Sequence, residues 1–95
     1  MYLYVDDSRD CPPGAMLAKN YQSAIEILET CDVDTISLDH DLGEEKTGYD
    51  ICKWMTEHDK WPEHVSFHTS NPVGRQNMQA EWMFYRKHKK NDPMG

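Results

Sequence analysis

Short apolar runs alternate along this chain with stretches in which apolar residues recur at helical spacing. The runs are rich in β-branched and aromatic residues, as is typical of strands. They predict strands at 2–5, 15–19, 36–38 and 65–67. The helical spacing predicts helices from 21 to 31, from 47 to 58 and from 72 into the basic stretch 86–90. Residues 8–14 contain Pro12-Pro13-Gly14, which excludes a helix or a central strand there and predicts a loop.

Each predicted helix begins with a residue suited to capping. Asn20 precedes the first helix, and Thr47 and Asp50 have the Thr-x-x-Asp spacing of a capping box at the second. The third begins with Asn71-Pro72, where the missing N–H of proline costs nothing at the first helical position. Because strands and helices alternate, the sequence predicts a parallel α/β sheet.

Length and composition are those of one small globular domain, spanning 1–95 with 86–95 as a basic helix end and tail. The chain has 95 residues, of which 38% are hydrophobic and 28% charged. No apolar run approaches the roughly 20 residues that a membrane-spanning helix needs, and the first residues lack a signal-peptide pattern. We therefore expect a cytoplasmic protein without membrane contact.

The formal charge of −7 is unevenly distributed. Residues 1–85 hold six basic against sixteen acidic side chains, whereas 86–95 hold four against one. Broad binding to DNA or RNA requires many lysine and arginine contacts to phosphate, so the acidic body argues against it. A small ligand or a divalent cation suits this charge better.

Three cysteines, Cys11, Cys31 and Cys52, form neither a paired framework nor a C-x-x-C motif. Cys31 and Cys52 lie on the apolar faces of predicted helices, so we expect both to be buried thiols.

Polar residues follow three of the predicted strands directly. They are Asp6-Asp7, Asp39-His40-Asp41 and His68-Thr69-Ser70. The carboxyl ends of parallel strands meet at one edge of a sheet, where ligands bind in open α/β folds. Carboxylates beside a buried strand need a cation, a counter-charge or water. Carboxylate groups suit Mg²⁺ or Mn²⁺, and imidazoles move the preference toward Mn, Fe or Zn.

The start of the last helix has features of a phosphate site. Backbone N–H groups follow Asn71, Gly74 permits close approach, and Arg75 lies one turn into the helix. The alternative interpretation is an ordinary capped helix with a solvated arginine. Arg9 is either a second phosphate clamp or an ion-pair partner of Asp7.

With these residues identified, the chain resembles the receiver domains of two-component response regulators. The resemblance lies in the acidic pair, the Asp after the central strand, a glycine nine residues later and a hydroxyl after the next strand: Asp6-Asp7, Asp39, Gly48 and Thr69. Two features depart from that pattern. The link after the first strand has no room for the usual first helix, and no fifth strand carries the receiver lysine.

A closer resemblance covers nearly the whole chain, to the short cyclic-phosphate processing receiver domains. Its motifs are Asp6-Asp7-Ser8-Arg9, the Ser37 to Gly43 segment, Thr47-Gly48-Tyr49-Asp50 and the His68 to Met78 segment. The resemblance implies a small α/β fold of the flavodoxin or receiver type, three-layered and truncated, with a mostly parallel four-stranded sheet. It also implies handling of cyclic phosphates in nucleotide or RNA-end metabolism.

The first functional hypothesis is a metal-dependent phosphoesterase that opens a cyclic phosphate. Its metal ligands would be Asp6, Asp7, Asp39 and Asp41, with Mg²⁺ or Mn²⁺ as the cofactor. His40 and His68 would divide the acid and base duties, while in another version Asp39 attacks phosphorus. The phosphate would be held by Arg9, Thr69, Ser70, Asn71, Gly74 and Arg75.

Two other functions fit the same residues. One is a non-catalytic receiver-like module that senses a phosphorylated ligand or a divalent cation. The other is a nuclease for RNA ends, in which Lys87, Lys89 and Lys90 contact the RNA backbone. The small core and the open sheet edges also predict a possible homodimer.

Overall fold

A computed structural model describes residues 1–8 and 10–90 of the chain. Four strands form one parallel sheet in the order β2-β1-β3-β4. The strands are β1 (Tyr2–Val5), β2 (Ala15–Ala18), β3 (Thr35–Leu38) and β4 (His64–Phe67). The helices are α1 (Tyr21–Thr30), α2 (Gly48–Glu57) and α3 (Pro72–Tyr85), and α3 continues into a π-helical segment, Arg86–Lys90. The predicted elements and the parallel α/β class are confirmed.

The helix starts form as their capping residues predict. The side chain of Asn20 accepts a hydrogen bond from Ser23 N at 2.8 Å, and that of Asn71 accepts one from Gly74 N at 3.0 Å. At α2 the backbone N–H of Thr47 donates to Asp50 Oδ2 at 2.8 Å. Each cap satisfies a backbone donor or a flanking N–H that the helix itself leaves unpaired.

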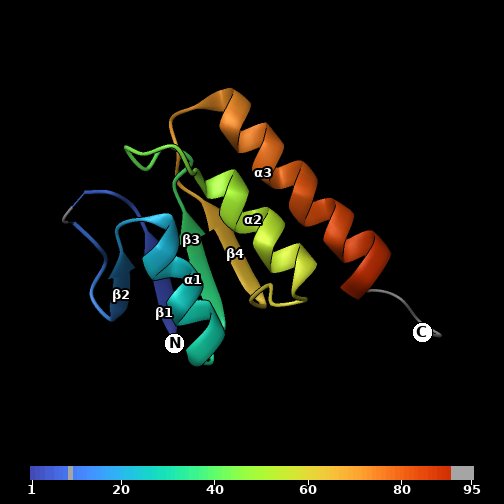
Figure 1. Cartoon of the computed structure of the whole chain (residues 1–95), viewed down its shortest axis with the longest axis horizontal. Coiled ribbons are helices and arrows are strands. Elements are labelled where there is room, and N and C mark those ends of the chain that lie inside the picture. Colours follow the sequence, from blue (N-terminus) through green and yellow to red (C-terminus); the bar gives the residue numbers. More distant parts are fainter. Residues whose placement is uncertain (9, 91–95) are drawn as a thin grey trace.

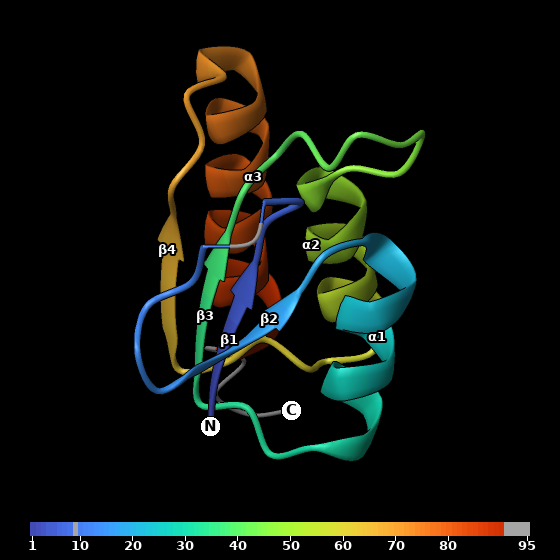
Figure 2. The ribbon, with the colours of Figure 1, turned by 90° about the vertical axis from the view of Figure 1, so that its left-hand side faces the viewer.

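The layers differ in one respect from the three-layer expectation. Figures 1 and 2 show α1, α2 and α3 on one side of the sheet, with the connection from β1 to β2 on the other. That connection is too short to hold the helix of a full receiver domain. Within the part of the chain that the structure describes, no helix covers the second face of the sheet. Side chains on this face are therefore accessible to form a site.

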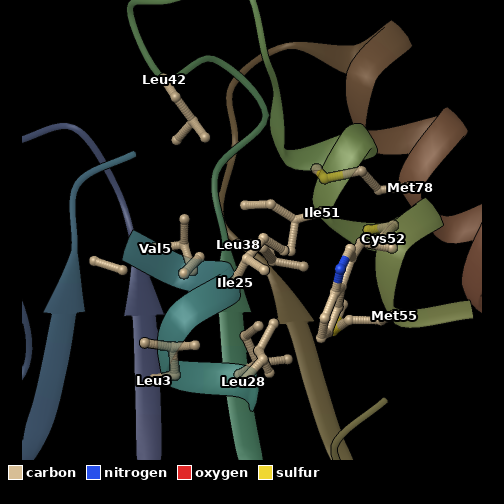
Figure 3. Close-up of a cluster of buried hydrophobic side chains, with 14 of the residues drawn as sticks. Leu3, Val5, Ile25, Leu28, Leu38, Leu42, Ile51, Cys52, Met55 and Met78 are labelled. Carbon is tan, nitrogen blue, oxygen red and sulfur yellow. The ribbon is translucent and has the colours of Figure 1, made fainter. Parts of the chain in front are cut away.

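The hydrophobic core lies between the sheet and the helices. Figure 3 shows it as a continuous cluster from the strands to α2 and α3. Its fully buried members include Leu3, Val5, Ile36, Leu38, Ile51, Met55 and Met78. Because side chains alternate along a strand, Tyr4 and Ser37 lie on the opposite, helix-free face, where the register pairs them directly.

One of the two cysteine predictions is wrong. Cys52 is fully buried, but Cys31 is exposed. Cys31 is the residue that ends α1, and its backbone N–H closes the last turn onto Ile27 O at 2.8 Å. The chain leaves the helical path there, so the helical spacing no longer determines where the side chain points.

None of the helices in the described part of the chain has the length and apolar character needed to span a bilayer. The predicted tail falls mostly at 91–95, outside the described residues.

Candidate functional site

The strand register places three polar side chains at one level of the sheet. Val5, Leu38 and Phe67 are aligned, so the next residues, Asp6, Asp39 and His68, are aligned too. The ladder continues through them, with Asp39 N donating to Val5 O and His68 N donating to Leu38 O, both at 3.0 Å. Since side chains alternate, these three point to the helix-free face, away from the core.

Asp6, Asp39 and His68 converge closely enough to share a ligand. Each offers one oxygen or nitrogen ligand atom, and these atoms lie within 4.8 Å of one another. We call these three residues the Asp-Asp-His group. All three side chains are partly buried, which limits their contact with water. The predicted convergence of strand ends is therefore present, and His68, which the sequence interpretation considered for acid–base duty, lies among the possible cation ligands.

His68 is held from three directions. Its Nε2 lies 2.9 Å from Asp6 Oδ2, and its Nδ1 lies 2.7 Å from the Ser37 hydroxyl. The imidazole also stacks on the Tyr4 ring, with centroids 4.3 Å apart and planes 5° from parallel. Together these contacts fix both the plane of the ring and the direction of each nitrogen.

The charge of Asp6 follows from its hydrogen bonds. Partial burial acts to raise the pKa of Asp6, but hydrogen bonds from the Ser8 backbone N–H, at 2.9 Å, and from His68 outweigh it, so the pKa is lowered. Asp6 is therefore ionised at neutral pH. Burial and then the Asp6 charge raise the pKa of Tyr4, which keeps the phenol beside His68 neutral.

His40 belongs to a second group on the other side of β3. Its Nδ1 lies 3.0 Å from Asp41 Oδ1, and Asn71 Nδ2 donates to Asp41 Oδ2 at 3.3 Å. We call His40, Asp41 and Asn71 the His40 group. The hydrogen bonds from His40 and then Asn71 lower the pKa of Asp41, which is ionised at neutral pH. His40 Nε2 has no hydrogen-bond partner among the described residues.

Gly74 brings α3 against the His40 ring. A Cβ on Gly74 would lie 2.3 Å from His40 Cγ, so only glycine permits this approach. The first turn of α3 thus orients the His40 ring, a role that its interpretation as a phosphate site did not include.

The residues predicted to bind phosphate mainly hold their own loop. Thr69 is buried, and its hydroxyl accepts a hydrogen bond from Asn71 N at 3.1 Å. Arg75 donates to Phe67 O at 2.8 Å and to Thr69 O at 2.6 Å. Ser70 is exposed and lies beside them in the same loop. Arg9 falls outside the described residues.

The remaining predicted carboxylates lie apart from the Asp-Asp-His group. Asp7 is exposed, with its carboxylate beside Gly43. Asp41 is 64% exposed and belongs to the His40 group. Asp7 is one residue from Asp6, so alternation turns it to the other side. Asp41 is two residues from Asp39 but lies beyond the end of β3, where its carboxylate contacts His40 and Asn71 instead.

Ser37, Tyr4 and Gly48 are contributors that the sequence interpretation gave no role. A hydroxyl inside the apolar run of β3 was the available signal for Ser37, since buried polar groups need a partner. A Cβ on Gly48 would lie 2.1 Å from Asp39 O, so this glycine lets α2 begin against the backbone of the site. The signal for Tyr4 becomes readable only once the register is known.

A comparison with protein families matches the chain to one family. The family model for the cyclic-phosphate processing receiver domain matches residues 1–84. No curated protein and no solved structure matches the chain. The match covers every strand and nearly all of α3, including both histidine groups. This chain belongs to the family of cyclic-phosphate processing receiver domains.

Proposed function

We propose that this domain is a metal-dependent phosphoesterase that opens a cyclic phosphate on a nucleotide or an RNA end. One observation carries the proposal, the convergence of the ligand atoms of Asp6, Asp39 and His68 within 4.8 Å. The cyclic phosphate as substrate comes from the name of the family, which says nothing about the reaction or the cofactor.

The donor set fits a divalent cation. Ligands at about 2.1 Å from Mg²⁺ or Mn²⁺ lie at most about 4.2 Å apart. A pair of these ligand atoms at the 4.8 Å limit would have to move together by roughly half an ångström. Two carboxylates and one imidazole suit Mn²⁺ better than Mg²⁺, which prefers oxygen alone. A cation held there would neutralise phosphate charge and lower the pKa of a coordinated water.

His40 is the candidate for proton transfer. Asp41 engages Nδ1 and thereby orients the ring, which leaves Nε2 available to give or take a proton. His68 has both nitrogens engaged, so in this proposal it is a ligand and the acid–base duty falls to His40. The sequence suggested that His40 and His68 divide the acid and base roles, whereas this proposal gives both roles to His40.

The loop from β4 to α3 would receive the phosphate. Arg75 and Thr69 order this loop through their hydrogen bonds. The exposed Ser70 hydroxyl is then presented beside the His40 group. In this proposal Arg75 acts through the loop, and its guanidinium does not grip the substrate directly.

A turnover screen tests the proposal. The substrates are 2′,3′-cyclic nucleotides, 3′,5′-cyclic nucleotides and RNA ending in a cyclic phosphate, each with Mg²⁺, Mn²⁺ or EDTA. We expect metal-dependent ring opening that Asp39→Ala abolishes. Asp32→Ala, an exposed aspartate before β3 at the other end of the sheet, is the matched control and should retain activity.

The same screen separates the enzyme from the sensing module. Thermal stabilisation by a cation or nucleotide, lost in Asp39→Ala but without turnover under any condition, would reject the enzyme and favour the module. Turnover that persists unchanged in EDTA would reject the role of the cation.

A further inference from the structure

Ser37 is a buried polar residue on the helix-free face of the sheet. It lies in the middle of β3, is only 3% exposed, and belongs to a strand whose other central residues form the core. Its hydroxyl is 2.7 Å from His68 Nδ1. Because a buried hydroxyl without a partner is costly, this hydrogen bond explains how a serine is tolerated there.

The neighbours of His68 determine which nitrogen carries the proton. Nε2 faces the Asp6 carboxylate, and a carboxylate can only accept hydrogen bonds. In the neutral ring Nε2 must therefore carry the proton that Asp6 accepts at 2.9 Å. Nδ1 is then an acceptor, and the Ser37 hydroxyl must donate to it.

Binding of a cation at Nε2 would reverse this arrangement. Nε2 is the ring nitrogen that faces Asp6, whereas Nδ1 faces Ser37, and a nitrogen that coordinates a cation carries no proton. The proton then belongs on Nδ1, which must donate. A hydroxyl serves both states, because it can donate or accept by rotating its hydrogen while the oxygen stays in place.

We propose that Ser37 is a positioning residue that holds His68 in both states of the site, donating to Nδ1 without a cation and accepting from Nδ1 with one. This inference rests on the proposed cation site but not on turnover. Ligating histidines generally donate their second ring N–H to a fixed acceptor, and loss of that acceptor weakens metal binding about 10- to 100-fold.

The first test measures cation affinity. Binding of Mn²⁺ and Zn²⁺ to the whole domain is compared by calorimetry for the wild type, Ser37→Ala and Ser37→Thr. We expect Ser37→Ala to bind about 10- to 100-fold more weakly and Ser37→Thr, which keeps the hydroxyl, to stay close to the wild type. Ser66→Ala is the matched control, because Ser66 is the exposed serine paired with Ser37 in the sheet register.

The second test locates the proton. Ring ¹⁵N chemical shifts of His68, which differ strongly between protonated and unprotonated nitrogens, are measured by NMR in EDTA and with diamagnetic Zn²⁺. We expect the proton on Nε2 in EDTA and on Nδ1 with Zn²⁺. The position of the proton reports the hydrogen bond to Nδ1 directly. A general loss of stability would not move the proton from one ring nitrogen to the other.

Several outcomes would overturn the inference. They are a proton on Nδ1 without a cation, equal affinities of Ser37→Ala and Ser66→Ala, weak binding by Ser37→Thr comparable with Ser37→Ala, or no cation binding by the wild type. Absence of turnover alone would overturn only the phosphoesterase, because both measurements are made without a substrate.

Discussion

Two histidines at the same edge of the sheet are held in opposite ways. His68 has both nitrogens hydrogen-bonded, one to Asp6 and one to Ser37, and its ring is stacked on Tyr4. His40 has only Nδ1 engaged, and Nε2 has no partner among the described residues. A histidine held at both ring nitrogens suits the role of a cation ligand. A histidine held at one nitrogen leaves the other available for proton transfer. The two histidines thus differ in their surroundings, and the roles proposed for them follow from that difference.

The difference originates in one step along a strand. His68 is the first residue after β4, and alternation turns it to the helix-free face, where Asp6 and Asp39 lie. His40 is the second residue after β3 and is turned toward the first turn of α3. Their separation therefore depends on register, because a shift by one residue would exchange their faces.

The largest expected effect comes from removing one carboxylate charge on each side. Asp39→Asn removes a ligand charge from the Asp-Asp-His group, so we expect Mn²⁺ affinity to fall on the order of 100-fold or more and turnover to disappear. Asp41→Asn changes only the His40 group. We expect its Mn²⁺ affinity to stay near the wild type and its turnover to fall about tenfold or more, because His40 loses its charged partner.

Calorimetry with Mn²⁺ and the cyclic-phosphate turnover assay check both variants. Equal losses of cation affinity in Asp39→Asn and Asp41→Asn would show that the two groups form one site, and the contrast between the histidines would fail.

A smaller effect is expected from adding one methyl group on each side. Gly48→Ala would push against the Asp39 carbonyl and the Met78 sulfur, both of which lie inside the fold. We expect a loss of about 2–3 kcal/mol in the free energy of unfolding, together with weaker Mn²⁺ binding. Gly74→Ala would instead displace the His40 ring, with a loss of about 1–2 kcal/mol and unchanged Mn²⁺ affinity.

Urea unfolding and Mn²⁺ titration of these two variants give the comparison directly. If Gly74→Ala weakened Mn²⁺ binding as much as Gly48→Ala, the His40 ring would have to be coupled to the Asp-Asp-His group, contrary to the separation described above.

The elements and the edge that carries the site could be predicted from the sequence because each depends on local chemistry. Strand composition, the Asn20 and Asn71 caps and the Thr47–Asp50 box act within a few residues. Parallel strands then bring their carboxyl ends together without any further information. This reasoning correctly placed Asp6, Asp39 and His68 at one edge.

Which neighbours share a face was harder to predict, because it depends on where each strand ends. Asp39 and Asp41 look equivalent in the sequence, but only Asp39 joins the Asp-Asp-His group. Arg75 shows a second limit. Its position in the helix suggested a phosphate clamp, whereas its contacts are the carbonyls of Phe67 and Thr69, which only the tertiary fold brings within reach.

Helix α3 shows the same limit for burial. Its apolar residues Val73, Met83 and Phe84 are exposed, while Met78 and Tyr85 are buried. As an outer helix of a single layer, α3 packs on the sheet and on α2 along a narrow stripe, so several of its apolar residues remain in solvent.

The smallest expected effect lies at the far end of α3 and separates local from global changes. Tyr85 is 7% exposed, and its hydroxyl donates to Asp59 Oδ1 at 2.5 Å, at the opposite end of α3 from Gly74 and the His40 group. Burial, and then the hydrogen bond and charge of Asp59, raise the pKa of Tyr85 to about 12. We expect Tyr85→Phe to lose about 1 kcal/mol of stability at neutral pH, because one hydrogen bond is removed and Asp59 remains hydrated.

The pH dependence of Tyr85→Phe has a definite sign. Since the folded pKa of about 12 exceeds the ordinary tyrosine pKa of 10.0, the contribution of Tyr85 is complete below pH 10 and is lost as the pH rises toward 12. The stability difference between wild type and Tyr85→Phe, measured by urea unfolding, should therefore shrink over that window, and a difference that grew would contradict the assignment.

The Mn²⁺ affinity of Tyr85→Phe should not change at neutral pH, because neither histidine group is touched. A weaker Mn²⁺ affinity in Tyr85→Phe would mean that the losses of affinity expected for Asp39→Asn and Gly48→Ala reflect general stability. The contrast between the two histidines would then depend on the NMR measurement of the His68 tautomer.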